Sequence, residues 1–102
     1  MAIGSITPFR PTGTVSLSAS NSSSAVALAG GGDSVVVTNT SNSLAYIRFG
    51  ADPTVSATSA DMPVLPNSRV MLSANILVTY AAGLLANGSG ALLFTRGDGS
   101  YV

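Results

Sequence analysis

The chain has 102 residues, of which 46% are hydrophobic and 8% are charged, and its formal net charge is zero. This length supports one domain with a single core. Lys, Glu, Gln, His, Cys and Trp are absent. Their absence removes His-activated nucleophiles, lysine Schiff bases, glutamate general acids and the usual ligands of zinc, haem and iron–sulfur clusters. We therefore expect no enzymatic activity, no metal and no cofactor, and the balanced Arg and Asp content predicts no nucleic-acid partner.

Residues 1–12 show neither helical nor strand periodicity, and Pro8 and Pro11 oppose regular ladder hydrogen bonding. We interpret them as an extended N-terminal arm that precedes one β domain over residues 13–102. The start of the chain has neither a basic stretch nor a continuous apolar run, so we expect synthesis in the cytoplasm without a secretory signal. The apolar side chains of the arm would be covered by a neighbouring molecule. The predicted partner interface comprises Ile3, Ile6, Pro8, Phe9 and Arg10. The alternative is that the arm is an edge strand or plug of its own domain.

Short apolar segments alternate with Ser-, Asn- and Gly-rich clusters along the rest of the chain. This pattern predicts an all-β fold, a single antiparallel β-sandwich or jelly-roll-like barrel of about seven to eight short strands. Strand lengths and spacings do not distinguish a jelly roll from another strand order. The expected strands, in chain order, cover residues 14–19, 25–28, 34–38, 44–49, 69–72, 76–81 and 91–96.

Two of these segments predict local detail. The β-branched residues 34–38 are followed by Asn-rich turn residues, which suggests a hairpin with residues 44–49. Within 44–49, alternation directs Ile47 and Phe49 towards the core. Arg48 then projects outward, where it is hydrated or pairs with an Asp.

Two longer stretches have less regular patterns. Residues 51–66 contain three prolines and are expected to form a long crossover loop. Residues 73–85 have apolar side chains at helical spacing, but Val78, Thr79 and Gly83 lower the helix propensity, so we favour a strand there. The uncharged stretch that includes them is interrupted by Asn and Gly residues, and its longest apolar part is too short to span a membrane as a helix. We expect no membrane partner.

Several short motifs match functional signatures only in part. Homodimeric aspartic proteases have Gly after Asp-Thr or Asp-Ser at the catalytic turn, whereas Asp33-Ser34 is followed by Val35. A phosphate-binding loop has a Lys after its glycines, and none follows Gly30-Gly31-Gly32. Arg96-Gly97-Asp98 matches the integrin-binding tripeptide, but its glycine suits a turn beyond the last strand. Asn-x-Ser/Thr sequons at Asn21, Asn39 and Asn87 are expected from the Ser and Thr content alone. We interpret the Asp, Gly and Arg-Gly-Asp motifs as turn or hairpin residues and draw no functional conclusion from the sequons.

A surface without net charge suits a protein that packs against many identical neighbours, since like charges across symmetric contacts repel. Residues 37–50, 61–66 and 90–99, which include Ala45-Tyr46-Ile47-Arg48-Phe49-Gly50 and Asp61-Met62-Pro63-Val64-Leu65-Pro66, resemble segments of small β-sandwich structural proteins of tailed bacteriophages and prophages. The resemblance implies a virion component, most plausibly a capsid decoration or cement protein, and it transfers no catalytic or cofactor residues.

The expected partners are the major capsid protein or another virion protein and further copies of the chain, and the expected location is the virion. Two alternatives remain open. One is a subunit of a phage tail, collar or fibre assembly. The other is a carbohydrate-binding β-sandwich, for which Tyr46, Tyr80 and Tyr101 are the available stacking platforms.

Overall fold

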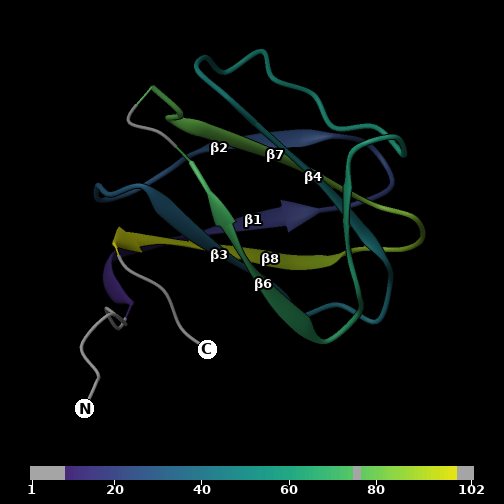
Figure 1. Cartoon of the computed structure of the whole chain (residues 1–102). Helices are drawn as coiled ribbons and strands as arrows, with labels where there is room; N and C mark the ends of the chain where they lie inside the picture. Colours follow the sequence, from purple (N-terminus) through teal and green to yellow (C-terminus); the bar gives the residue numbers. More distant parts are fainter. Residues whose placement is uncertain (1–8, 75–76, 99–102) are drawn as a thin grey trace.

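The computed structural model describes residues 9–74 and 77–98 (Figure 1). These residues form two four-stranded antiparallel sheets, with strand orders β1-β8-β3-β6 and β2-β7-β4-β5. The strands are β1 (Arg10–Ala19), β2 (Ser24–Ala27), β3 (Ser34–Asn39), β4 (Ala45–Gly50), β5 (Met62–Val64), β6 (Ser68–Ser73), β7 (Tyr80–Leu85) and β8 (Gly90–Asp98). This strand order is that of a jelly roll. The predicted all-β sandwich is confirmed, and the topology supplies the order that the sequence pattern left open.

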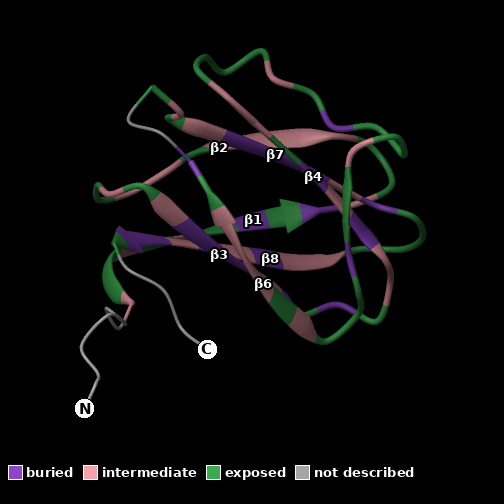
Figure 2. Cartoon of the chain, viewed as in Figure 1, coloured by how far each residue is buried: buried purple, intermediate pink, exposed green. Residues whose placement is uncertain are grey.

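The core lies between the two sheets and is built from alternate residues of facing strands (Figure 2). Its largest fully buried apolar side chains are Phe94, Leu85, Leu92, Val35 and Val37. Ile47 is buried in the same cluster and Phe49 packs against it, as the alternation in β4 predicts. Arg48 is exposed on the opposite side of the strand.

Strand β7 begins four residues after the predicted start of this strand, and the helix considered for residues 73–85 is wrong over its described part. The inner side of β7 contains small residues, so the segment lacks the bulky apolar side chains by which a strand is usually predicted. A Cβ on Gly83 would lie 2.6 Å from Leu92 Cδ1 and 3.1 Å from Leu17 Cδ2. Gly83 therefore makes room for leucines of the opposing sheet, where a larger residue would force them to move.

The hairpin predicted between residues 34–38 and 44–49 is wrong, because β3 and β4 belong to different sheets. A buried asparagine explains the corner between them. The side chain of Asn39 is fully buried, and its Nδ2 donates towards the carbonyl oxygens of Ser43 (2.8 Å), Val64 (3.1 Å) and Leu65 (3.2 Å). Its Oδ1 accepts hydrogen bonds from the backbone N–H and hydroxyl of Ser41. These bonds replace the ladder that a hairpin would form and direct the chain into the second sheet.

The N-terminal boundary also differs from the expected one. Strand β1 begins at Arg10, so residues 10–12 belong to the sandwich and not to the arm of residues 1–12. Arg10 pairs with Asp98 and Pro11 with Gly97, and the register shifts between Pro11 and Gly13. Proline is tolerated here because β1 is an edge strand and the shift interrupts the ladder beside it. Of the predicted interface residues, Ile3, Ile6 and Pro8 lie outside the described residues.

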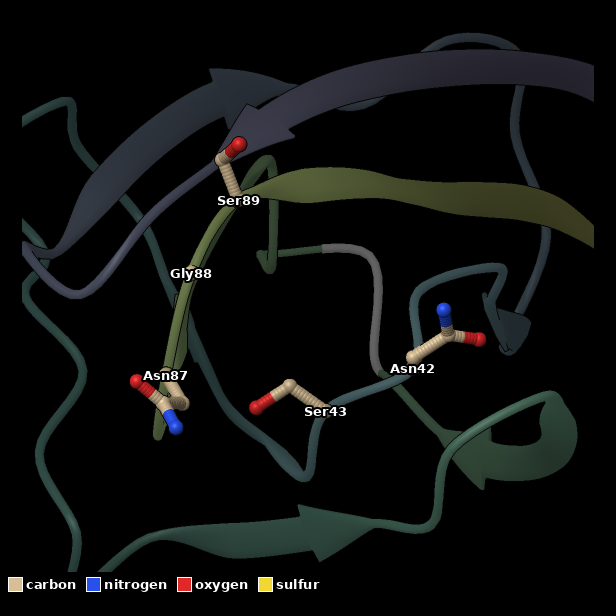
Figure 3. A pocket seen from close by; sticks show the side chains of 5 residues that line it. All are labelled: Asn42, Ser43, Asn87, Gly88 and Ser89. Atoms are coloured by element: carbon tan, nitrogen blue, oxygen red, sulfur yellow. The ribbon is translucent and has the colours of Figure 1, made fainter.

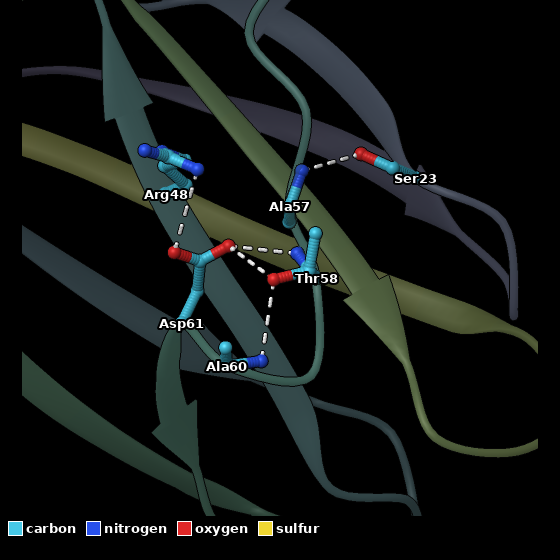
Figure 4. Close-up of polar contacts among 6 residues, drawn as sticks. All are labelled: Ser23, Arg48, Ala57, Thr58, Ala60 and Asp61. Carbon is cyan, nitrogen blue, oxygen red and sulfur yellow. Dashed lines mark hydrogen bonds and ion pairs between the residues drawn. The ribbon is translucent and has the colours of Figure 1, made fainter.

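The long connection between β4 and β6 is irregular as predicted, apart from the short strand β5. We call residues 51–61 the cover segment, because they cross the outer face of the β2-β7-β4-β5 sheet. Figure 4 shows Ala57, Thr58 and Asp61 in front of β4 and β7. The Ala57 N–H donates to the Ser23 hydroxyl next to β2 (2.8 Å), and Asp61 Oδ1 lies 3.9 Å from Arg48 Nη1 on β4. The segment is thus attached beside β2, at one edge of the sheet, and to the interior strand β4.

Candidate interaction surface

The two outer faces of the sandwich differ in how they are covered. Ala82 projects outward from β7, yet it is fully buried, and Ala57 of the cover segment is 4% exposed. Neither residue belongs to the core cluster between the sheets. The cover segment, and not the opposing sheet, therefore buries Ala82.

Local polar contacts hold the cover segment in shape. Asp61 Oδ2 accepts hydrogen bonds from the backbone N–H of Thr58 at 2.7 Å and from its hydroxyl at 3.2 Å (Figure 4). Near the start of the segment, hydrogen bonds from the hydroxyl and then from the backbone N–H of Thr54 hold the pKa of Asp52 below its ordinary value. Because each acid accepts bonds from its own turn, we assign both a structural role.

The outer face of the β1-β8-β3-β6 sheet has no corresponding cover among the described residues, and we call it the open face. The strand register places on it the residues that alternate with the core-facing ones, and one of them, Val36, is itself only 8% exposed. They are Thr14, Ser16 and Ser18 of β1, Ala91, Leu93 and Thr95 of β8, Ser34, Val36 and Thr38 of β3, and Arg69, Met71 and Ser73 of β6. Small hydroxyl groups surround an apolar centre, and Arg69 is the one charged side chain within this set.

Two residues of the predicted partner interface lie at one end of the open face. A Cβ on Gly97 would point outward and lie 2.1 Å from the carbonyl oxygen of Arg10 and 2.9 Å from Cζ of Phe9. The Phe9 ring therefore rests on the backbone of β8, at a place where only glycine leaves room for it. Phe9 is half-buried and Arg10 is exposed. The structure brings these two residues next to the open face, which the sequence pattern did not associate with them.

The Arg96-Gly97-Asp98 tripeptide lies within β8, and the expectation of a turn at Gly97 is wrong. Arg96 is 4% exposed, and its guanidinium donates to the carbonyl oxygens of Gly32 (2.9 Å) and Val78. Asp98 Oδ1 accepts a hydrogen bond from the backbone N–H of Asp33 at 3.2 Å. Burial of the arginine removes the exposed presentation that an adhesive tripeptide requires. Arg96 instead joins β8 to the connections that precede β3 and β7.

A polar hollow of about 420 Å³ lies at one end of the sandwich, between the β3–β4 corner and the β7–β8 turn (Figure 3). It is lined by Asn42, Ser43, Asn87, Gly88 and Ser89. The lining offers amides and hydroxyls but no charged group and no aromatic ring. It lacks the apolar walls and convergent charged groups that are typical of a small-molecule site.

The sequons and tyrosines have separate positions. Asn39 is buried in the corner described above and cannot accept a glycan in the folded chain, whereas Asn21 and Asn87 are exposed. Tyr46 and Tyr80 both face outward from the β2-β7-β4-β5 sheet, but Tyr46 pairs with Leu84, which is four residues from Tyr80 along β7. That spacing is about 13 Å, so the two rings form no common stacking platform. Tyr101 lies outside the described residues.

Among the described residues, no cluster of acidic side chains is arranged to hold a metal ion, and no helix is long and apolar enough to cross a membrane.

Sequence reasoning missed the centre of the open face, namely Val36, Leu93 and Met71. One signal was present, because the run Leu92-Leu93-Phe94 supplies apolar side chains to both faces of its strand. Such a run indicates either burial on both sides or an apolar outer surface.

Comparisons with protein-family models, with curated proteins and with solved structures find no match for this chain.

Proposed function

We propose that the protein is a non-enzymatic structural component of a bacteriophage virion, a decoration or cement protein that binds the repeating capsid lattice through its open face. The observation that carries this proposal is the composition of that face, in which Arg69 is the one charge among the described residues, beside half-buried Leu93 and Met71 and the nearly buried Val36. Burial of apolar area and fixed hydroxyl groups would supply the attraction. Jelly rolls recur in viral capsid proteins, although a fold alone does not assign a function.

The partner in this proposal is the major capsid protein or another virion protein. The arm residues Ile3, Ile6, Pro8, Phe9 and Arg10 contribute to the same contact, because Phe9 and Arg10 lie at the end of the open face. An identical surface would serve a tail, collar or fibre subunit, so location on the particle is a separate question. Electron microscopy of particles from the strain that encodes the chain distinguishes these positions, and particles without the chain would refute the proposal.

The open face is tested by co-sedimentation of purified variants with particles that lack the chain. Leu93→Lys places a charge at its centre and is expected to weaken binding at least about tenfold. Leu65→Lys is the matched control, because Leu65 is 67% exposed and follows β5 in the other sheet. Both variants should keep the thermal unfolding transition. Equal binding by Leu93→Lys and the unmodified chain would exclude the open face.

Ionic strength provides a second test of the same contact. With one charged side chain on the open face, binding should change little between about 0.1 and 0.5 M salt, where screening of exposed charges becomes strong. Release of the chain by salt would instead indicate charge pairs made by Arg10 or Arg69.

The arm is tested by two deletions. Removal of residues 2–8 retains Phe9 on Gly97 and the pairing of Arg10, and it should lower particle binding without lowering the unfolding temperature. Removal of residues 2–11 also removes those contacts with β8 and should lower both. An unfolding temperature that already falls with the shorter deletion would mean that the arm belongs to its own fold.

A further inference from the structure

The four edges of the two sheets differ in their protection against pairing with another strand. Strand β5 has three residues and contains Pro63, β2 has four residues, and β6 carries Arg69. Short length, proline and charge are the features that block edge-to-edge association. Strand β1 has ten residues, and its proline and register shift are confined to Pro11–Gly13. From Thr14 to Ala19 it has no charge, proline or bulge, so this edge is the least protected of the four.

The register shows which backbone groups this edge presents. The N–H of Thr40 donates to Ala91, so the Ala91 carbonyl points from β8 towards β3. Because carbonyl directions alternate along a strand, Leu92 and Phe94 form their bonds towards β1. Their partners in β1 are Leu17 and Val15.

The N–H and C=O groups of Thr14, Ser16 and Ser18 therefore point away from the sheet. The described residues form no backbone hydrogen bond with them. All three side chains are exposed hydroxyls. Water solvates this row in the single chain, and a strand of matching length would satisfy it.

We propose that β1 pairs antiparallel with β1 of a second copy, about a two-fold axis at Ser16, to form one continuous sheet across a dimer. In this register Ser16 faces Ser16 of the second copy and Thr14 faces Ser18, so every exposed backbone group of the row finds a partner. The arrangement forms about six backbone hydrogen bonds. It brings no charges together, and pairing ends at the register shift beside Pro11. A second copy is favoured over an unrelated strand because the row is self-complementary. The dimer does not depend on the proposed function.

Sedimentation of the full chain from about 10 µM to 1 mM covers the affinities expected for a modest interface. The unmodified chain should form dimers within this range. Ser16→Lys places two like charges opposite each other at the axis and should raise the dimer dissociation constant at least about tenfold. Ser73→Lys is the matched control, since Ser73 is an exposed serine on the other edge of the same sheet. A chain that stays monomeric, or equal effects of both substitutions, would overturn the proposal.

A cross-link tests the axis without adding charge. The chain contains no cysteine, so Ser16→Cys introduces a single thiol. Residues of a hydrogen-bonded antiparallel pair have Cα atoms about 5.5 Å apart, within the range that a disulfide spans. Under mild oxidation Ser16→Cys should form a covalent dimer much faster than Ser73→Cys. Equal rates for the two variants would exclude a two-fold axis at Ser16.

Discussion

Asn39→Asp provides the sharpest test of the corner that sends the chain from one sheet to the other. The side chains have the same shape, but a carboxylate has no hydrogen to donate to the carbonyl oxygens of Ser43, Val64 and Leu65. The two hydrogens of Nδ2 satisfy at most two of these oxygens. Leaving two buried or part-buried acceptors without a partner costs about 1–3 kcal/mol each. We therefore expect a loss of about 2–6 kcal/mol at neutral pH, a large part of the stability of a small domain.

The effect should also depend on pH, with a definite sign. Burial and the facing carbonyl oxygens disfavour the charged carboxylate, so the pKa of the introduced carboxyl group is raised above its unfolded value. The protonated acid can donate one hydrogen bond, and the destabilisation is smallest below the unfolded pKa of about 3.9. It grows as the pH rises through the folded pKa. The free energy of unfolding from denaturant titrations at pH 4 and pH 7, each compared with the unmodified chain, measures this difference.

Asn42→Asp is the matched control. Asn42 is exposed, and its Oδ1 accepts a hydrogen bond from Asn67 Nδ2 at 3.3 Å, which an aspartate also accepts. This variant should change the stability by less than about 0.5 kcal/mol. A loss in Asn39→Asp that matches this control, or that is the same at both pH values, would refute the role assigned to the buried amide.

Three further predictions concern the core, the buried arginine and an acidic turn. Phe94→Ala should lower the free energy of unfolding by about 3–5 kcal/mol because Phe94 is fully buried, and Phe49→Ala should lower it less because Phe49 is partly exposed. Denaturant unfolding measures both, and the reverse order would mean that the strand faces are misassigned. Arg96→Lys should lower the free energy of unfolding by about 2–4 kcal/mol, since an ammonium cannot reproduce the hydrogen bonds to Gly32 and Val78. Arg10→Lys, at an exposed position, should change it little, and equal effects of the two substitutions would contradict the structural role of Arg96. Thr54→Ala removes the hydroxyl that donates to Asp52 and should raise the pKa of Asp52 towards its ordinary value in an NMR titration; an unchanged titration would contradict that bond. Because the native pKa is lowered, the associated stability is present above the unfolded pKa and is lost as the pH falls through the folded pKa.

The strands could be predicted largely from local alternation, and their order could not. In β4, Ile47 and Arg48 face opposite sides because neighbouring residues of any strand do so. Which strands become neighbours depends on contacts between distant residues, as between β1 and β8 at the two ends of the described chain. The predicted position of a strand was wrong where residue size mattered more than hydrophobicity. In β7, Gly83 lacks a side chain and so leaves space for Leu92.

The same distinction applies to the candidate surfaces. The apolar arm residues could be noticed in the sequence because no periodic element buries them. The open face could not, because Val36, Leu93 and Met71 come together only after three strands have paired in register. The hairpin was predicted wrongly for a related reason. Asn39 resembles an ordinary turn residue, and its bonds to Val64 and Leu65 exist only once a strand from a distant part of the chain is in place.

The contrast between the two outer faces has a physical consequence for partner choice. Ordering the cover segment costs about 1–2 kcal/mol of backbone entropy per residue, and the burial of Ala57 and Ala82 helps to offset it. Within residues 9–74 and 77–98 no such segment covers the open face, and Leu93 and Met71 keep part of their surface exposed there. With Arg69 as its one charge, long-range attraction and repulsion are both weak there. A partner is then selected by shape and by the positions of the Ser and Thr hydroxyls, because an uncharged surface that fits poorly leaves polar groups unpaired.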